Sequence, residues 1–75
     1  MKPIRVVVHG AQGKIGREVV RAVWREPGME LVGAVELKPD SDCLLLPDGS
    51  GGVPFSSDLA NILERCQPDV LIDLP

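Results

Sequence analysis

The chain has 75 residues, of which 44% are hydrophobic and 25% charged, and its formal net charge is −3. This composition is typical of a small soluble globular protein with one domain at most. An acidic chain with one Phe, one Trp and no Tyr lacks the basic clusters and stacking rings that bind nucleic acid, and no apolar run approaches the roughly 18 residues that cross a membrane.

The two cysteines and the single histidine are too few to form a structural zinc site, so we expect no metal. Cys43 and Cys66 lie far apart in the sequence and read as reduced thiols. The N-terminus lacks the apolar core of a signal peptide. Together these features predict a cytoplasmic protein.

The first predicted element is a strand over Ile4–His9, because residues 6–8 form a β-branched run. A glycine turn follows, with the spacing G-x-x-G-x-x-G instead of the more familiar G-x-G-x-x-G. We expect Gly10 to allow a sharp reversal, Gly13 to let the backbone approach a phosphate, and Gly16 to let the next helix pack closely. A strand that leads through such a turn into a helix N-terminus favours binding of a dinucleotide pyrophosphate.

The helix after this turn is predicted to run from about Lys14 to Glu26, where Pro27-Gly28 ends it. Apolar residues recur at helical spacing and predict the face that packs on a sheet. The residues expected on that face are Ile15, Val19, Ala22 and Val23, with Val20 and Trp24 at its margin.

The second predicted strand covers Glu30–Glu36 and is continuously apolar in its middle, as expected of a parallel strand covered on both faces. Glu36 stands 20 residues after Gly16, where a carboxylate can accept hydrogen bonds from an adenosine ribose. It is also possible to read Glu36 as the first solvated residue after a buried strand. Lys38 can neutralise a ribose 2′-phosphate or be a solvated loop lysine, so the cofactor is either NADH or NADPH.

Residues 37–52 are rich in Pro, Asp, Ser and Gly and predict a long, poorly ordered loop. Its Leu44-Leu45-Leu46 run can cover an adenine ring, pack on a neighbouring chain, or simply anchor the loop. A short extended piece at 53–55, a helix at about Asp58–Cys66 capped by Ser56 or Ser57, and a last strand at Asp69–Leu74 complete the chain. The inward residues of this helix are expected to be Leu59, Ile62 and Leu63.

The predicted order is β-α-β-loop-α-β, which makes the fold class α/β and specifically half of a doubly wound, Rossmann-like parallel sheet. His9 is expected at the end of the first strand. It either touches the cofactor or is a partly buried residue whose ring nitrogens bond to backbone.

Residues 4–18, 31–36, 52–59 and 69–73 resemble the N-terminal domain of the 4-hydroxy-tetrahydrodipicolinate reductase (dihydrodipicolinate reductase) family. That family usually has the turn G-A-x-G-R-M-G, so Lys14 and Ile15 stand where it has Arg and Met. The resemblance implies that the cofactor contacts are Gly10, Ala11, Gln12, Gly13, Lys14, Ile15, Glu36 and Lys38. Asp73 is followed by Leu74-Pro75 and not by the Phe-Thr usual in the family.

The resemblance also implies hydride transfer from NADH or NADPH to an unsaturated heterocyclic dicarboxylate in diaminopimelate and lysine biosynthesis. The family's histidine pair and lysine belong to a second, substrate-binding domain that this chain does not contain. We therefore expect residues 1–75 to form an NAD(P)-binding fragment with no catalytic residue and no turnover of its own, which uses small-molecule substrate only within the complete enzyme. Its exposed sheet edges favour a homo-oligomer.

Two other interpretations remain open from the sequence, because a fold does not fix a function. One is a non-catalytic module that senses a nucleotide or binds CoA. The other is the first half of a different two-domain dehydrogenase, such as a semialdehyde or diamino-acid dehydrogenase.

Overall fold

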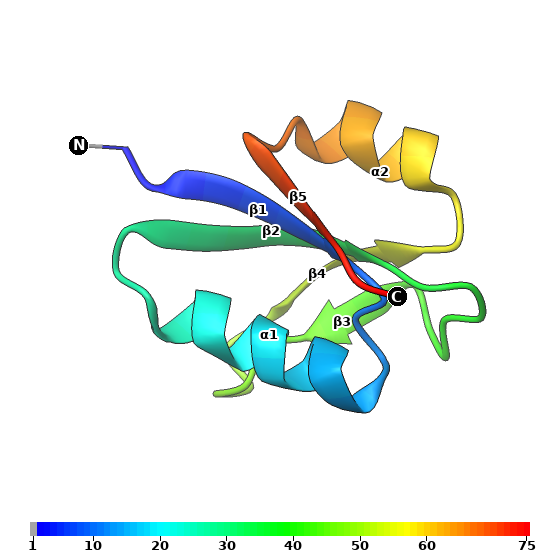
Figure 1. The fold of residues 1–75 in the computed structure, drawn as a ribbon, viewed down its shortest axis with the longest axis horizontal. Helices are drawn as coiled ribbons and strands as arrows, with labels where there is room; N and C mark the ends of the chain where they lie inside the picture. Colours follow the sequence, from blue (N-terminus) through cyan, green and yellow to red (C-terminus); the bar gives the residue numbers. More distant parts are fainter. Residues whose placement is uncertain (1) are drawn as a thin grey trace.

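The computed structural model describes residues 2–75, which form one five-stranded sheet and two helices (Figure 1). The strand order across the sheet is β3-β4-β2-β1-β5. β4, β2, β1 and β5 are parallel to their neighbours, and β3 alone runs antiparallel to β4. The strands are β1 Ile4–His9, β2 Met29–Val35, β3 Cys43–Leu45, β4 Gly52–Ser56 and β5 Val70–Asp73.

The predicted α/β class and doubly wound half-sheet are confirmed by this topology. The chain adds strands in one direction from β1 through β2 to β4, and then returns to place β5 on the other side of β1. Figure 1 shows α1 and α2 on opposite faces of the sheet. The direction of winding therefore reverses between β1 and β5. In folds of this type, ligands bind at the carboxyl ends of the two strands where this reversal occurs.

β1 lies inside the sheet, between β2 and β5, where its β-branched side chains are buried on both faces. Val6 and Val8 belong to the apolar cluster on the α1 face, whereas Val7 packs with Ile62 and Cys66 on the α2 face. All three valines of β1 are at most 1% exposed. This alternation follows from the two-residue period of a strand, and it holds the end of β1 rigidly between two packed layers.

Helix α1 spans Lys14–Arg25, one residue shorter than predicted, with Glu26 at its C-terminal cap. The predicted buried face is partly wrong. Gly16, Val20 and Val23 are buried, whereas Ile15 is 66% exposed and Ala22 is also exposed. The helix is rotated because the backbone of Gly16 packs directly on the glycine turn, so the residues one and two turns beyond Gly16 face the sheet.

Helix α2 spans Leu59–Cys66 and buries Ile62 and Cys66. Its N-terminal cap is Asp58, whose carboxylate accepts a hydrogen bond from Asn61 N–H at 3.1 Å, so the predicted serine caps are wrong. The Ser56 hydroxyl instead accepts from the Asp58 N–H at 3.0 Å and orients the capping residue. Aspartate is among the strongest N-cap residues because its oxygen can satisfy a free N–H of the first turn.

The segment predicted as a poorly ordered loop contains β3, which forms a hairpin with β4. Leu44 and Leu46 pack against the core on the α1 face, and Leu45, between them, is 72% exposed. Of the three roles considered for these leucines, anchoring the segment to its own domain is the one supported by the structure. Neither α1 nor α2, the helices within residues 2–75, has the length and apolar character needed to cross a membrane.

Candidate functional site

The turn after β1 has the backbone geometry that the glycine pattern predicts. Gly10 has φ of +90°, and its N–H donates to the Val35 carbonyl at 2.8 Å. A side chain at this position would be strained by the left-handed backbone and would also place its Cβ 3.3 Å from the Leu74 Cβ. The interpretation of Gly10 as the residue that permits the reversal is confirmed.

Gly16 permits close packing of the helix, as predicted. A Cβ built on Gly16 would collide with the Gly10 carbonyl oxygen and lie 2.9 Å from two backbone atoms of Ala11. Because every one of these neighbours is backbone, no side-chain rotation can relieve the overlap. Gly16 therefore fixes the first turn of α1 directly against the glycine turn.

The N-terminus of α1 leaves backbone donors free. Gly13 is the N-cap residue, has no side chain to accept a hydrogen bond, and is followed by a first turn without an acidic residue. Across residues 2–75, the N–H groups of Gly13, Lys14 and Ile15 have no hydrogen-bond partner. Free donors at the positive end of a helix dipole favour an anion.

Glu36 faces this turn from the end of β2. Its Oε2 accepts from the Gln12 N–H at 3.0 Å and its Oε1 accepts from the Leu37 N–H at 3.0 Å. The carboxylate is therefore half-buried beside the glycine turn and is not simply the first solvated residue after the strand. Its contact with a ribose stays a prediction, and its position next to the turn is the one that such a contact needs.

Gln12 fastens the turn to the segment after β2. Its Nε2 donates to the Lys38 carbonyl at 3.2 Å, and its Oε1 accepts from the Asp40 N–H at 2.9 Å. The Lys38 side chain itself is exposed and makes no side-chain hydrogen bond or ion pair with the described residues. The glycine pattern predicts that Gln12 lies in the turn, but it does not predict that the Gln12 side chain joins the turn to residues 38–40. The only sign of that role in the sequence is a long amide side chain between Gly10 and Gly13.

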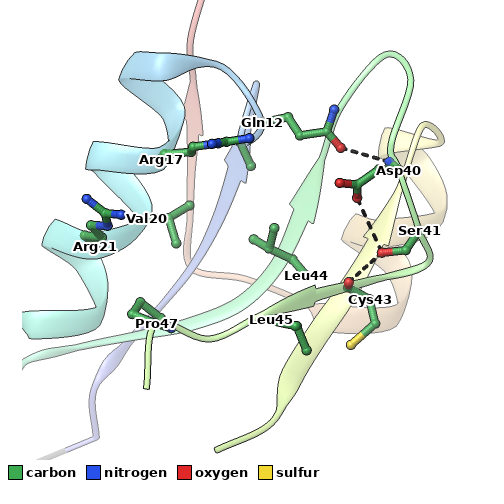
Figure 2. A pocket seen from close by; sticks show the side chains of 11 residues that line it. Gln12, Arg17, Val20, Arg21, Asp40, Ser41, Cys43, Leu44, Leu45 and Pro47 are labelled. Carbon is green, nitrogen blue, oxygen red and sulfur yellow. Dashed lines mark hydrogen bonds between the residues drawn. The ribbon is translucent and has the colours of Figure 1, made fainter. Parts of the chain in front are cut away.

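A groove of about 550 Å³ runs beside the turn, between α1 and the segment that leads into β3 (Figure 2). Arg17 and Arg21 line one side and Asp40 and Ser41 the other, and Val20 and Leu44 contribute to its apolar floor. Of the eight predicted contact residues only Ala11 and Gln12 line this groove. The other six, Gly10, Gly13, Lys14, Ile15, Glu36 and Lys38, lie around the turn outside it.

Arg17 and Arg21 are not predicted to line this groove, because a cation on the polar side of an amphipathic helix ordinarily indicates a solvated face. Their spacing of four residues places them on one face of α1. That spacing, on the helix that begins at the glycine turn, is the signal that could have identified them.

His9 and Asp73 stand side by side at the ends of β1 and β5, where the winding direction reverses. His9 Nδ1 lies 2.9 Å from Asp73 Oδ1, yet this buried nitrogen has no hydrogen-bond partner of acceptable geometry within the described part of the chain. His9 is partly buried, as predicted, but it faces a carboxylate and not the backbone. No group of three or more potential metal ligands gathers within residues 2–75.

Comparison with known proteins identifies the family of this chain. Residues 4–75 match the family model described as dihydrodipicolinate reductase, N-terminus. The chain belongs to this family. The resemblance found in the sequence is thereby confirmed, and the interpretation as part of a different two-domain dehydrogenase is not supported.

Individual relatives show the same match. The chain is 49% identical over 73 residues to a 4-hydroxy-tetrahydrodipicolinate reductase of Dehalococcoides mccartyi strain CBDB1, covering 97% of this chain and 28% of that protein. It is 39% identical over 71 residues to the reductase of Syntrophomonas wolfei, covering 92% and 27%. The chain thus spans a little over a quarter of the length of these curated relatives.

A solved structure supports the fold assignment independently. The dipicolinate-bound dihydrodipicolinate reductase from Paenisporosarcina sp. TG-14 superimposes with a TM-score of 0.76 at 35% identity. The match covers 97% of this chain and 29% of that one. The described fold is therefore that of one part of a larger reductase structure.

Proposed function

We propose that this chain is the NAD(P)H-binding portion of a reductase that transfers hydride to a dihydrodipicolinate-type substrate in diaminopimelate and lysine biosynthesis. The observation that carries the proposal is that free backbone amides at the start of α1 and the Glu36 carboxylate lie at the same glycine turn. An anion receptor next to a ribose acceptor fits a dinucleotide. The family match supplies the reaction class.

In this proposal the N–H groups of Gly13, Lys14 and Ile15 donate to the pyrophosphate. Gly10 and Ala11 keep the backbone close to the bound dinucleotide because their own N–H groups are already bonded to the Val35 carbonyl. The Lys14 ammonium, in the first turn of α1, adds positive charge near the phosphates.

The ribose end of the dinucleotide is bound by Glu36, Gln12 and Lys38. Glu36 accepts from the ribose hydroxyls, and Gln12 holds the 38–40 segment in place beside them. Lys38 leaves its ammonium free to face a 2′-phosphate, so the site accepts NADH or NADPH. Glu36 is already held in position by the N–H groups of Gln12 and Leu37, and the Lys38 side chain is exposed.

The bound nicotinamide supplies the hydride, while this chain binds and orients the cofactor. No catalytic residue is proposed within residues 1–75, and we propose that the substrate-binding domain lies outside them and that the chain alone does not turn over. A cytoplasmic location fits Cys43 and Cys66, which are both free thiols. β5, with Val70 44% exposed at the sheet edge, is the surface on which a homo-oligomer would form.

Isothermal titration calorimetry with NADH tests the proposal. Glu36→Gln exchanges a charged acceptor for a neutral one, which we expect to weaken NADH binding by about fivefold to tenfold. The matched control is Glu64→Gln, the same exchange on the exposed surface of α2, which leaves the affinity unchanged.

Two results would contradict the proposal. One is that the unsubstituted chain binds neither NADH nor NADPH. The other is that Glu36→Gln binds NADH as tightly as the unsubstituted chain. Binding of CoA in preference to both dinucleotides would instead support the non-catalytic module considered from the sequence.

A further inference from the structure

Within residues 2–75, β5 is attached to the sheet by one neighbouring strand. It is the outermost strand, and it runs beside β1 (Figure 1). Val70 is 44% exposed and Leu71 is 36% exposed, so little apolar burial holds this strand in place. A strand with one partner and few buried contacts opens more readily than the strands inside the sheet.

His9, the last residue of β1, contacts the carboxyl end of β5 through both its backbone and its side chain. Its carbonyl oxygen accepts from the Leu74 N–H at 3.0 Å. Its Nδ1 lies 2.9 Å from the Oδ1 of Asp73, the residue opposite His9 in the pairing of the two strands. Leu74 in turn packs on the glycine turn, with its Cβ 3.3 Å from the place that a Cβ of Gly10 would take. His9 therefore holds the end of β5 beside the turn.

The side-chain contact depends on the charge of the imidazole. Nδ1 of His9 is buried and makes no hydrogen bond of acceptable geometry with the described residues. In a neutral ring this nitrogen is either an acceptor that faces the acceptor oxygen of Asp73 or a donor that is misaligned, and both leave a buried polar atom unsatisfied. A protonated ring is attracted to the carboxylate without needing that alignment. The contact therefore favours the imidazolium.

Among residues 2–75, Asp73 is the one charged group that pairs with His9. On β2 the residue opposite His9 is Val35, and the carboxylate of the next residue, Glu36, accepts from backbone N–H groups of the turn and of Leu37. His9 follows Val7 by two residues and so lies on the α2 face, whereas α1 covers the opposite face. The α2 residues packed on this face are uncharged, and the charged residues at α2 are exposed: Asp58, Glu64 and Arg65.

We propose that His9 and Asp73 form a pH-dependent latch that fastens the carboxyl end of β5 to β1. The latch is closed when His9 is protonated, and it is lost as the pH rises through the range in which histidines release their proton, between about pH 5 and 8. Its opening frees Leu74 and uncovers Gly10 at the strand ends where the winding direction reverses. The shape of this edge of the sheet, at which ligands bind in folds of this type, thereby depends on pH. The proposal does not require that a dinucleotide binds.

Native-state hydrogen exchange of the ¹⁵N-labelled chain, followed by NMR at about pH 5.5 and about pH 7.5, tests the latch. His9 is the single histidine of the chain, so it is the side chain expected to change charge in this interval. The side chains of His9 and Asp73 are 36% and 69% exposed, so solvent weakens their attraction. After correction for the pH dependence of chemical exchange, we expect the opening constant of the β5 amides and of the Leu74 amide to rise by about twofold to fivefold at the higher pH.

His9→Gln and Asp73→Asn each remove one charge of the pair, and we expect the opening constant of β5 in both variants to be the same at the two pH values. The matched control is Asp42→Asn, the same exchange at an exposed aspartate before β3, which should keep the pH dependence of the unsubstituted chain. Thermal unfolding verifies that each variant is folded. Because the Asp73 side chain is mostly exposed, Asp73→Asn tests the latch even if His9→Gln does not fold.

Three results would overturn the proposal. The first is an opening constant of β5 that is the same at both pH values in the unsubstituted chain. The second is a pH dependence that persists in His9→Gln, which would assign it to another group. The third is a pH dependence that persists in Asp73→Asn, which would show that His9 acts without this carboxylate.

Discussion

Replacing Gly16 by alanine tests the packing that places the helix N-terminus over the glycine turn. The added Cβ meets the Gly10 carbonyl oxygen and two backbone atoms of Ala11, so the whole first turn of α1 has to move. Overpacking at a rigid position costs up to about 3 kcal/mol. The better helix propensity of alanine offsets about 1 kcal/mol of this cost. The net expected loss is about 2 kcal/mol of unfolding free energy.

For a domain of this size, that loss corresponds to a fall of roughly 8–16 °C in the midpoint of thermal unfolding, measured by circular dichroism. Gly28→Ala is the matched control, because a Cβ there has only the Glu26 carboxylate near it, at 3.8 Å. Its unfolding temperature should fall by no more than a few degrees. A Gly16→Ala chain that unfolds at the temperature of the unsubstituted chain would refute the close packing of α1 on the turn.

Two further predictions concern local hydrogen bonds. Asp58→Ala removes the cap of α2 that accepts from the Asn61 N–H; it should lower the free energy of unfolding by about 1 kcal/mol and so lower the urea midpoint. The control is Asp42→Ala, which changes an exposed aspartate that caps no helix and should leave the midpoint unchanged. Equal midpoints for the two variants would contradict the cap. Hydrogen bonds from the Ser50 side chain first, and from its backbone N–H second, lower the pKa of Asp48 below 3.8, so the stabilisation from this turn is present above pH 3.8 and is lost as the pH falls through the lowered pKa. An NMR titration of the Asp48 carboxylate should show the lowered pKa, and Ser50→Ala should move the titration midpoint back toward 3.8. A midpoint at or above 3.8 in the unsubstituted chain would contradict these hydrogen bonds.

The parts of the fold that the sequence predicts well are those fixed by local chemistry. The β-branched run of β1 and the two glycines Gly10 and Gly16 each have one physical interpretation, and the structure confirms it. Glu36 follows a buried strand as predicted, and its carboxylate lies beside the turn. Gly10 is the clearest case, since its φ of +90° is a conformation that few other residues tolerate.

What the sequence did not predict depends on contacts between distant segments. Ile15 looks like a core residue by spacing, but the docking of Gly16 on the turn rotates it to the surface. β3 is only three residues long in a segment rich in turn formers, and it becomes a strand because β4 offers it a partner. Arg17 joins the candidate site only because the segment before β3 folds back beside α1.

The central claim is that the amides at the start of α1 bind the pyrophosphate of a dinucleotide. The most direct measurement is an NMR titration of the ¹⁵N-labelled chain with NADH, following each backbone amide. We predict that the amides of Gly13, Lys14 and Ile15 shift most, together with that of Gln12 beside Glu36. Saturable binding that leaves these four amides unmoved and shifts those of α2 instead would contradict the claim.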